Sequence, residues 1–192
     1  MQFDQSISWQ RLEERLARTT NPRHRQMLQV VIDHAKAESS GDVDGLMATL
    51  SDDPQYHFWS NGQDWGPKGR DGVRAFYESF VASGAGFFES HKARTVVDDE
   101  NVVTESVMRG IVPGTVAQAR GCAVEDVNGH YLVTARTAIF WPFDEDGKLI
   151  GEDSYGSSDG SVERVPDDEL PAEYVAMLDA IGFAPAPASA SA

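Results

Sequence analysis

Residues 34–59 read HAKAESSGDVDGLMATLSDDPQYHFW, and this stretch decides the fold. A helix ends just before Asp42, whose carboxylate can accept from free backbone N–H groups and so cap a short second helix reaching about Leu50. Pro54 is expected to end that helix, and the aromatic residues 56–59 favour a strand. The order of helix, short helix and strand predicts a helical layer folded over the opening of a sheet.

Hydrophobic periodicity and turn residues predict the other elements. The expected helices span residues 8–20, 23–39, 71–83 and 167–183, and the expected strands span residues 87–97, 102–112, 130–143 and 148–155, the last of which closes the sheet. Residues 113–129 are expected to form an irregular connection or a pair of short pieces. Helices followed by strands, with one early strand, predict an α+β fold in which a curved antiparallel sheet wraps around helices as a cone-shaped barrel.

The chain is expected to form one domain with two tails. Residues 1–22 are an N-terminal helical arm, residues 23–160 are the core domain, and residues 161–192 hold an acidic helix and a disordered Ala/Pro/Ser tail. The tail, APAPASASA, has too few large apolar side chains to fold.

Charge and composition narrow the possible partners. The 192 residues carry 31 acidic and 16 basic side chains, a formal net charge of -15. Nucleic acids and anionic membranes bind basic surfaces, so neither is expected as a partner. The beginning of the sequence lacks the apolar region of a secretion signal, which favours a cytoplasmic location. The single cysteine, Cys122, excludes an internal disulfide framework.

The pattern GDVDGLMATLSDDPQYHF resembles the superfamily of ketosteroid isomerases, SnoaL-like proteins and nuclear transport factor 2. The similarity continues through GRDGVRAFY at residues 69–77 and ends with FDEDGKLIGEDSYG at residues 143–156, so it covers about residues 24–160. The resemblance implies the cone fold. It does not select a reaction, because this fold hosts isomerases, hydrolases, dehydratases, cyclases, lyases and proteins without catalysis.

The family's spacing and the alternation of strand residues indicate which side chains face into the cone. His34 falls where ketosteroid isomerases place an oxyanion-binding tyrosine, and it could act there as donor or as general acid–base. The alternative is a helix histidine satisfied by Glu38. Phe58 and Ile139 stand where those isomerases carry an aspartate base and a protonated aspartic acid, so the sequence excludes a steroid-type isomerase.

The closing strand offers a carboxylate instead. Glu152 is expected to line the pocket and to act as a general base with a raised pKa. A slip of one residue would put Asp153 in its place. Tyr56 adds an inward phenol. The candidate catalytic residues are therefore His34, Glu152, Tyr56 and Asp153.

The expected substrate-binding residues are mostly aromatic or charged. They are Phe58, Trp59, Phe76, His91, Glu105, Arg109 and Trp141. Counting along the strands with the family's spacing and no gaps places Glu105 and Arg109 inward, where Arg109 could hold a phenolate or carboxylate. The alternative is a structural ion pair between the two residues. Trp59 would face away from the pocket in a regular strand.

An aromatic pocket with a few acid–base groups suits an apolar, ring-containing substrate and proton chemistry without a cofactor. The sequence contains no metal-binding, dinucleotide or phosphate-loop spacing. The chain looks most similar to the SnoaL-like branch, which includes the diarylpropane formaldehyde lyases of lignin-derived aromatic catabolism. That resemblance implies a cofactor-independent lyase that releases formaldehyde from a diaryl diol, with His34 and Glu152 carrying protons and Arg109 or Tyr56 holding oxygen.

Other functions stay open. A SnoaL-like dehydratase, cyclase or isomerase would use similar groups. An epoxide hydrolase is a further alternative, against which Ser154 argues because it stands where hydrolases carry an aspartate. A non-catalytic ligand-binding module is the third alternative. The fold's outer sheet face implies a homo-oligomer, a dimer or a trimer.

Overall fold

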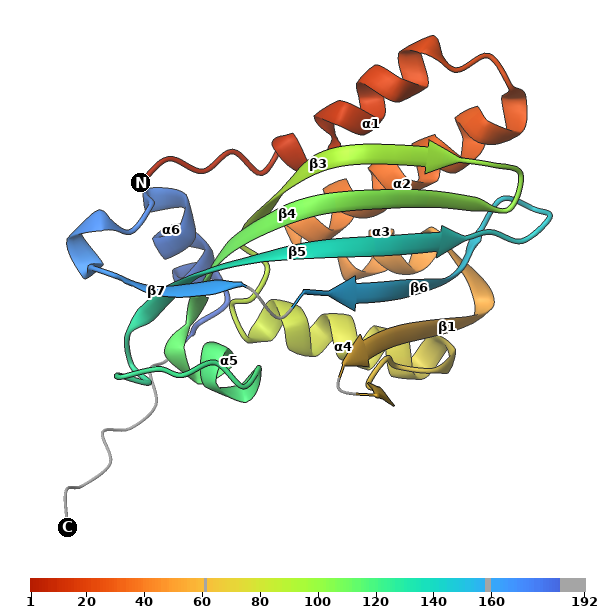
Figure 1. Cartoon of the computed structure of the whole chain (residues 1–192). Helices are drawn as coiled ribbons and strands as arrows, with labels where there is room; N and C mark the ends of the chain where they lie inside the picture. Colours follow the sequence, from red (N-terminus) through yellow and green to blue (C-terminus); the bar gives the residue numbers. More distant parts are fainter. Residues whose placement is uncertain (61, 158–159, 184–192) are drawn as a thin grey trace.

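The computed structural model describes residues 1–60, 62–157 and 160–183, and it places helices against one face of a curved sheet (Figure 1). The helices are α1 (Ile7–Arg18), α2 (Pro22–Ser40), α3 (Val43–Ala48), α4 (Gly69–Ala82), α5 (Gly114–Ala119) and α6 (Ala172–Ala180). The strands are β1 (Leu50–Ser60), β2 (Gln63–Asp64), β3 (Phe88–Val97), β4 (Asn101–Pro113), β5 (His130–Pro142), β6 (Leu149–Gly156) and β7 (Ser161–Val165).

The strand order is β2-β1-β6-β5-β4-β3, and β7 also pairs with β5. β5 pairs with β7 over residues 130–134 and with β6 over residues 137–140. The predicted α+β class is confirmed. The sheet is not wholly antiparallel, because β1 and β6 run parallel. They are joined through two helices, α4 and α5, and the four strands β2 to β5, so no tight turn requires them to be antiparallel. The sheet stays open rather than closing into a barrel.

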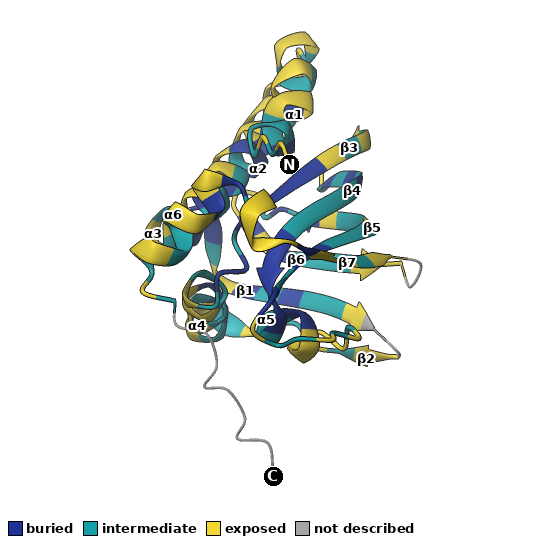
Figure 2. Cartoon of the chain, turned by 90° about the vertical axis from the view of Figure 1, so that its left-hand side faces the viewer, coloured by how far each residue is buried: buried dark blue, intermediate teal, exposed yellow. Residues whose placement is uncertain are grey.

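The main core lies between the sheet and the helices. Figure 2 shows α2, α3 and α4 on one side of the strands. The buried apolar side chains of this core include Val31, Leu46, Met47, Val73 and Leu149. Removal of this apolar surface from water is the main force that holds the two layers together.

The junction of α2 and α3 forms as its sequence predicts. Gly41 ends α2 in the left-handed conformation, with φ of 68°, and its N–H bonds to carbonyls of the last turn. Asp42 then caps α3 by accepting from the N–H of Gly45 at 2.9 Å.

Two local predictions at the start of elements were wrong. Pro54 lies inside β1 and does not end a helix; the pairing of β1 with β6 shifts between Leu50 and Gln55, which accommodates the proline. The first helix was expected to begin at residue 8. It begins at Ile7 after Ser6 as cap, so Ser8 lies within α1 and is 2% exposed.

The chain after β6 adds a strand that the sequence pattern did not predict. β7 pairs with β5, so β6 is not the last strand of the sheet. α6 follows, and its Tyr174 packs with Phe87, Ile111 and Val165 in a second core cluster. The Ala/Pro/Ser tail at 184–192, predicted to be disordered, lies outside the described residues.

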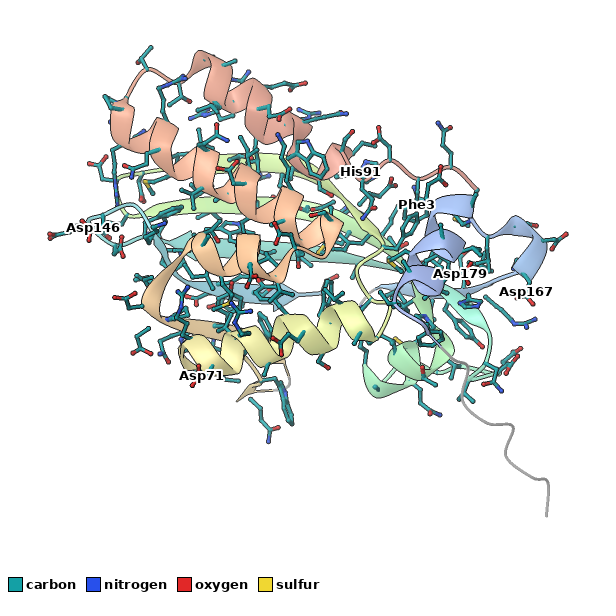
Figure 3. All side chains as sticks on the ribbon, turned by 180° about the vertical axis from the view of Figure 1, so that it is seen from behind. Phe3, Asp71, His91, Asp146, Asp167 and Asp179 are labelled. Carbon is teal, nitrogen blue, oxygen red and sulfur yellow. The ribbon has the colours of Figure 1, made fainter. Side chains whose placement is uncertain are left out.

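Acidic side chains project from the periphery of the molecule. Figure 3 labels the exposed Asp71, Asp146, Asp167 and Asp179. None of the helices in the described part of the chain is long and apolar enough to cross a lipid bilayer.

Candidate active site

Two adjoining cavities lie between the helical layer and the sheet. The smaller has a volume of about 280 Å³, and its lining includes the predicted aromatic residues Phe58, Phe76 and Trp141. The larger has a volume of about 590 Å³. The residues that line both are Glu38, Phe88, Met108 and Arg120. Volumes of this size suit a small organic ligand.

Glu152 lines the smaller cavity from β6, on the face that the alternation predicted. It lies opposite Tyr56 in the parallel β1–β6 pair. The preceding Gly151 permits this close pairing, because a Cβ there would lie 2.0 Å from the carbonyl oxygen of Gln55. Burial raises the pKa of Glu152 to about 8, and the negative charge of Glu38 adds to the rise.

Glu38 is a second cavity carboxyl, which the sequence analysis considered only as a partner for His34. Val31, Ala35 and Glu38 line the smaller cavity from one face of α2. Burial raises the pKa of Glu38 to about 7, while the positive charge of Lys92 opposes the rise. The signal was present in the sequence, since Glu38 continues an apolar stripe with helical spacing.

The two carboxyls share a mostly apolar space and influence each other electrostatically. A second negative charge in such a space is costly, so the pair retains a proton near neutral pH. One member can then donate a proton while the other accepts one.

Lys92 is the amine of the smaller cavity. Its Nζ donates to the carbonyl oxygen of Ser8 and to Oγ of Ser90, the latter at 3.4 Å. Burial lowers the pKa of Lys92 to about 8, and Glu38 acts in the opposite direction. A partly desolvated ammonium near Glu38 favours the ionised form of that carboxyl over that of Glu152.

His34 lies beneath the cavities, fully buried, and does not line either of them. Thr49 donates from Oγ1 to the Leu46 carbonyl at 2.6 Å, which leaves its oxygen to accept from Nδ1–H of His34 at 2.8 Å. Nε2 of His34 is then the acceptor for the hydroxyl of Tyr77 at 2.9 Å. The suggested Glu38 partner is therefore wrong.

The hydrogen-bond chain continues to Tyr56, whose hydroxyl bonds to that of Tyr77 at 2.9 Å. Burial lowers the pKa of His34 to about 3, so the imidazole is neutral at physiological pH. Tyr56 is also fully buried, and burial raises its pKa well above the usual value. Both residues thus belong to a closed polar network behind Glu152.

On β4 the residues buried toward the helices include Thr104 and Ser106, so Glu105 and Arg109 direct their charged groups to the other face, and their predicted inward orientation was wrong. Arg109 contributes to the lining of the larger cavity, but its guanidinium pairs with Glu89 at 2.8 Å and lies over the ring of Phe3. Glu105 pairs with Arg94 at 2.8 Å. A slip of one residue in the gap-free count exchanges the two faces of a strand.

His91 also lies outside the cavities, where its Nε2 bonds to Glu89 at 2.8 Å. Figure 3 shows it near the N-terminal segment. On the outer face of β1, Trp59 is 43% exposed and stacks on His57. Asp153 pairs with His57 in the strand register and lines neither cavity.

Residues 1–60, 62–157 and 160–183 contain no group of three His, Cys, Asp or Glu side chains arranged to hold a metal ion. The site as described consists of two carboxyls, an amine and an arginine around an apolar space.

The model of the SnoaL-like domain matches residues 31–150. No curated protein matches the chain. Among solved structures, an epoxide hydrolase of the LEH-like type from Mycobacterium tuberculosis is 17% identical, with a TM-score of 0.51 over 71% of this chain and 86% of that chain.

Two further structures have the same fold. The epoxide hydrolase/cyclase-like enzyme SalBIII, described for pyran ring formation in salinomycin, is 10% identical with a TM-score of 0.52, over 72% of this chain and 95% of its own. A Mycobacterium tuberculosis protein in complex with estradiol-17beta-hemisuccinate is 15% identical with a TM-score of 0.51, over 70% of this chain and 95% of its own. At these identities the likeness shows the fold alone.

Proposed function

This chain belongs to the SnoaL-like domain family, and from that premise we propose that it is a cofactor-independent lyase acting on a small aromatic substrate. The proposed substrate is a diaryl diol of the lignin-derived type, and the proposed one-carbon product is formaldehyde. The observation that supports this most is the pair of carboxyls, Glu38 and Glu152, in one apolar cavity.

Cleavage of a 1,2-diaryl-1,3-diol needs two proton transfers at once. A base removes the proton of the terminal hydroxyl, the adjacent C–C bond breaks, and formaldehyde leaves. The electron pair of that bond forms a C=C double bond while the benzylic hydroxyl takes a proton from an acid and departs as water. The diol therefore yields one alkene, one formaldehyde and one water.

The environments of the two carboxyls suggest their roles. Glu38, beside Lys92, is the more easily ionised and is proposed as the base. Glu152 holds its proton to higher pH and is proposed as the acid. Activity should then be highest between about pH 7, where Glu38 ionises, and about pH 8, where Glu152 loses its proton. In this scheme His34 positions Tyr56 and its neighbours without touching the substrate.

The test is turnover of a 1,2-diaryl-1,3-propanediol, followed by formaldehyde release and by the absorbance of the stilbene product. Glu38→Gln and Glu152→Gln should each lower kcat about 100-fold or more, because each removes one proton transfer. Glu105→Gln, a carboxyl on the outer face, is the matched control and should keep its activity. A wild-type protein that releases no formaldehyde, or an active Glu152→Gln variant, would contradict the proposal.

The same two carboxyls favour epoxide hydrolysis as a second candidate. The acid would protonate the epoxide oxygen while the base activates water. Stilbene oxide distinguishes the two reactions, since a hydrolase converts it to a diol without releasing formaldehyde. A ligand-binding module would bind these aromatic compounds and convert none of them.

A further inference from the structure

Arg120 stands at the junction of the two cavities. It follows directly after α5, where Gly121 adopts a left-handed conformation with φ of 81°. The N–H of Gly121 bonds to the Gln118 carbonyl at 2.9 Å, and that of Cys122 bonds to the Ala117 carbonyl at 3.0 Å. These bonds hold the end of the helix, and Arg120 contributes to the lining of both cavities.

The guanidinium of Arg120 has neither an ion pair nor a side-chain hydrogen bond to any residue in the described part of the chain. Other arginines near acidic groups do have partners: Arg94 pairs with Glu105, and Arg109 with Glu89. Arg120 is an exposed residue that also lines both cavities, so its guanidinium is open to an incoming anion.

A second polar group of the larger cavity also lacks a partner. Thr137 lies on β5 between Ala135 and Ile139, and it helps to line this cavity. Its Oγ1 is buried and has no hydrogen-bond partner among the described residues. A buried hydroxyl without a partner is unfavourable, so this group, together with the unpaired Arg120, points to a polar ligand.

We propose that the larger cavity is a subsite for a carboxylate carried by one aromatic ring of the substrate, bound by Arg120 and Thr137. A planar guanidinium can donate two parallel hydrogen bonds to a carboxylate, and the threonine hydroxyl can donate a third. A phenol fits less well, because at neutral pH it is mostly uncharged.

The rest of the lining suits the ring that would carry this carboxylate. Phe80, Phe88, Met108 and Val133 provide apolar walls in the larger cavity. The reacting diol would then lie in the smaller cavity, with Glu152. The inference rests on the proposed function only in taking the substrate to be aromatic with its reacting carbons near the two carboxyls.

Binding of a neutral and a charged probe of the same shape tests the subsite without turnover. Biphenyl-4-carboxylate and biphenyl-4-carboxamide are titrated into the protein and followed by calorimetry. The wild type should bind the carboxylate about tenfold more tightly, the gain typical of one charge-assisted contact. Arg120→Met should abolish this preference, Arg120→Lys should keep part of it, and Thr137→Val should reduce it a few-fold.

Arg136→Met is the matched control, because it removes the same charge from an exposed position of β5 outside both cavities. It should leave the preference unchanged. Equal binding of the two probes by the wild type, or a preference that survives Arg120→Met, would overturn the proposal. Failure of the lyase assay would leave this binding result intact, and turnover of uncharged diols would survive the loss of the subsite.

Discussion

At the scale of the residue, His34 is held on both ring nitrogens by buried partners. Such a side chain contributes to stability through its hydrogen bonds and its packing against Trp141, with ring centroids 5.5 Å apart. Its removal leaves Thr49 and Tyr77 without their partner in a place that water does not reach.

His34→Ala is therefore expected to lower the free energy of unfolding by about 2–4 kcal/mol, as the sum of a cavity and unsatisfied hydroxyls. Urea unfolding measures this change. The control is His24→Ala, a histidine 22% exposed and paired with the exposed Asp99, which should cost less than about 1 kcal/mol. If His34→Ala keeps full stability and loses only turnover, His34 acts on the substrate and not on the network.

The cavity carboxyls give stability a distinctive pH dependence. Glu38 and Glu152 have pKa values raised to about 7 and about 8 in the folded protein, so the folded state holds protons that the unfolded state releases. The ionisation of these two carboxyls therefore lowers the free energy of unfolding as the pH rises from about 4.5 to about 8. His34 acts in the other direction: its lowered pKa costs stability as pH falls from 6.5 towards about 3.

Glu152→Gln should accordingly be more stable than the wild type at pH 8 and above, by more than about 1 kcal/mol, the value of one pKa unit. The difference should shrink as the pH falls through 4.5, because the carboxyl then becomes protonated in the unfolded state as well. Denaturant unfolding at a series of pH values measures it. A constant difference between the two proteins across this range would show that the carboxyl of Glu152 is not desolvated.

At the scale of the element, α1 lies outside the matched SnoaL-like range and still contributes to the site. Ser8 accepts the N–H of Ser90 on its Oγ at 3.0 Å, and its carbonyl accepts from Lys92. The helix thus covers the edge of β3 and holds the cavity amine in place.

Ser8→Ala should destabilise the protein by about 1–3 kcal/mol, because it leaves the buried N–H of Ser90 unpaired. Ser6→Ala, a serine exposed at the start of the same helix, should change stability by less than about 1 kcal/mol. Hydrogen exchange at Ser90 reports the effect directly and should accelerate only in Ser8→Ala. Unchanged protection would mean that α1 does not seal this edge.

At the scale of the whole molecule, the helices cover one face of an open sheet and enclose the cavities on that side (Figure 2). The other face of β1, β5 and β6 exposes the apolar residues Trp59, Phe140, Ile150 and Tyr155. Exposed apolar side chains on one sheet face are compatible with the expected dimer or trimer. Self-association stays a prediction.

Much of the fold follows from local sequence signals. The cap at Asp42 and the alternation along β6 each depend on a few neighbouring residues, so the fold class and the inward side chain of Glu152 could be predicted. A proline inside β1 and the short strand β7 were missed, because their pairing partners, β6 and β5, are distant in the sequence.

The sequence by itself thus determined the family, the helix–strand order and one cavity carboxyl, since these depend on neighbours along the chain. Only the tertiary structure decided that Glu38, Lys92 and Arg120 join Glu152 and that His34 and Arg109 do not line the reacting site with their functional groups. A shift of one residue reverses the faces of a strand, and contacts between distant segments depend on how every layer packs. The composition of a site built from α2, β3, the end of α5 and β6 is therefore settled by packing.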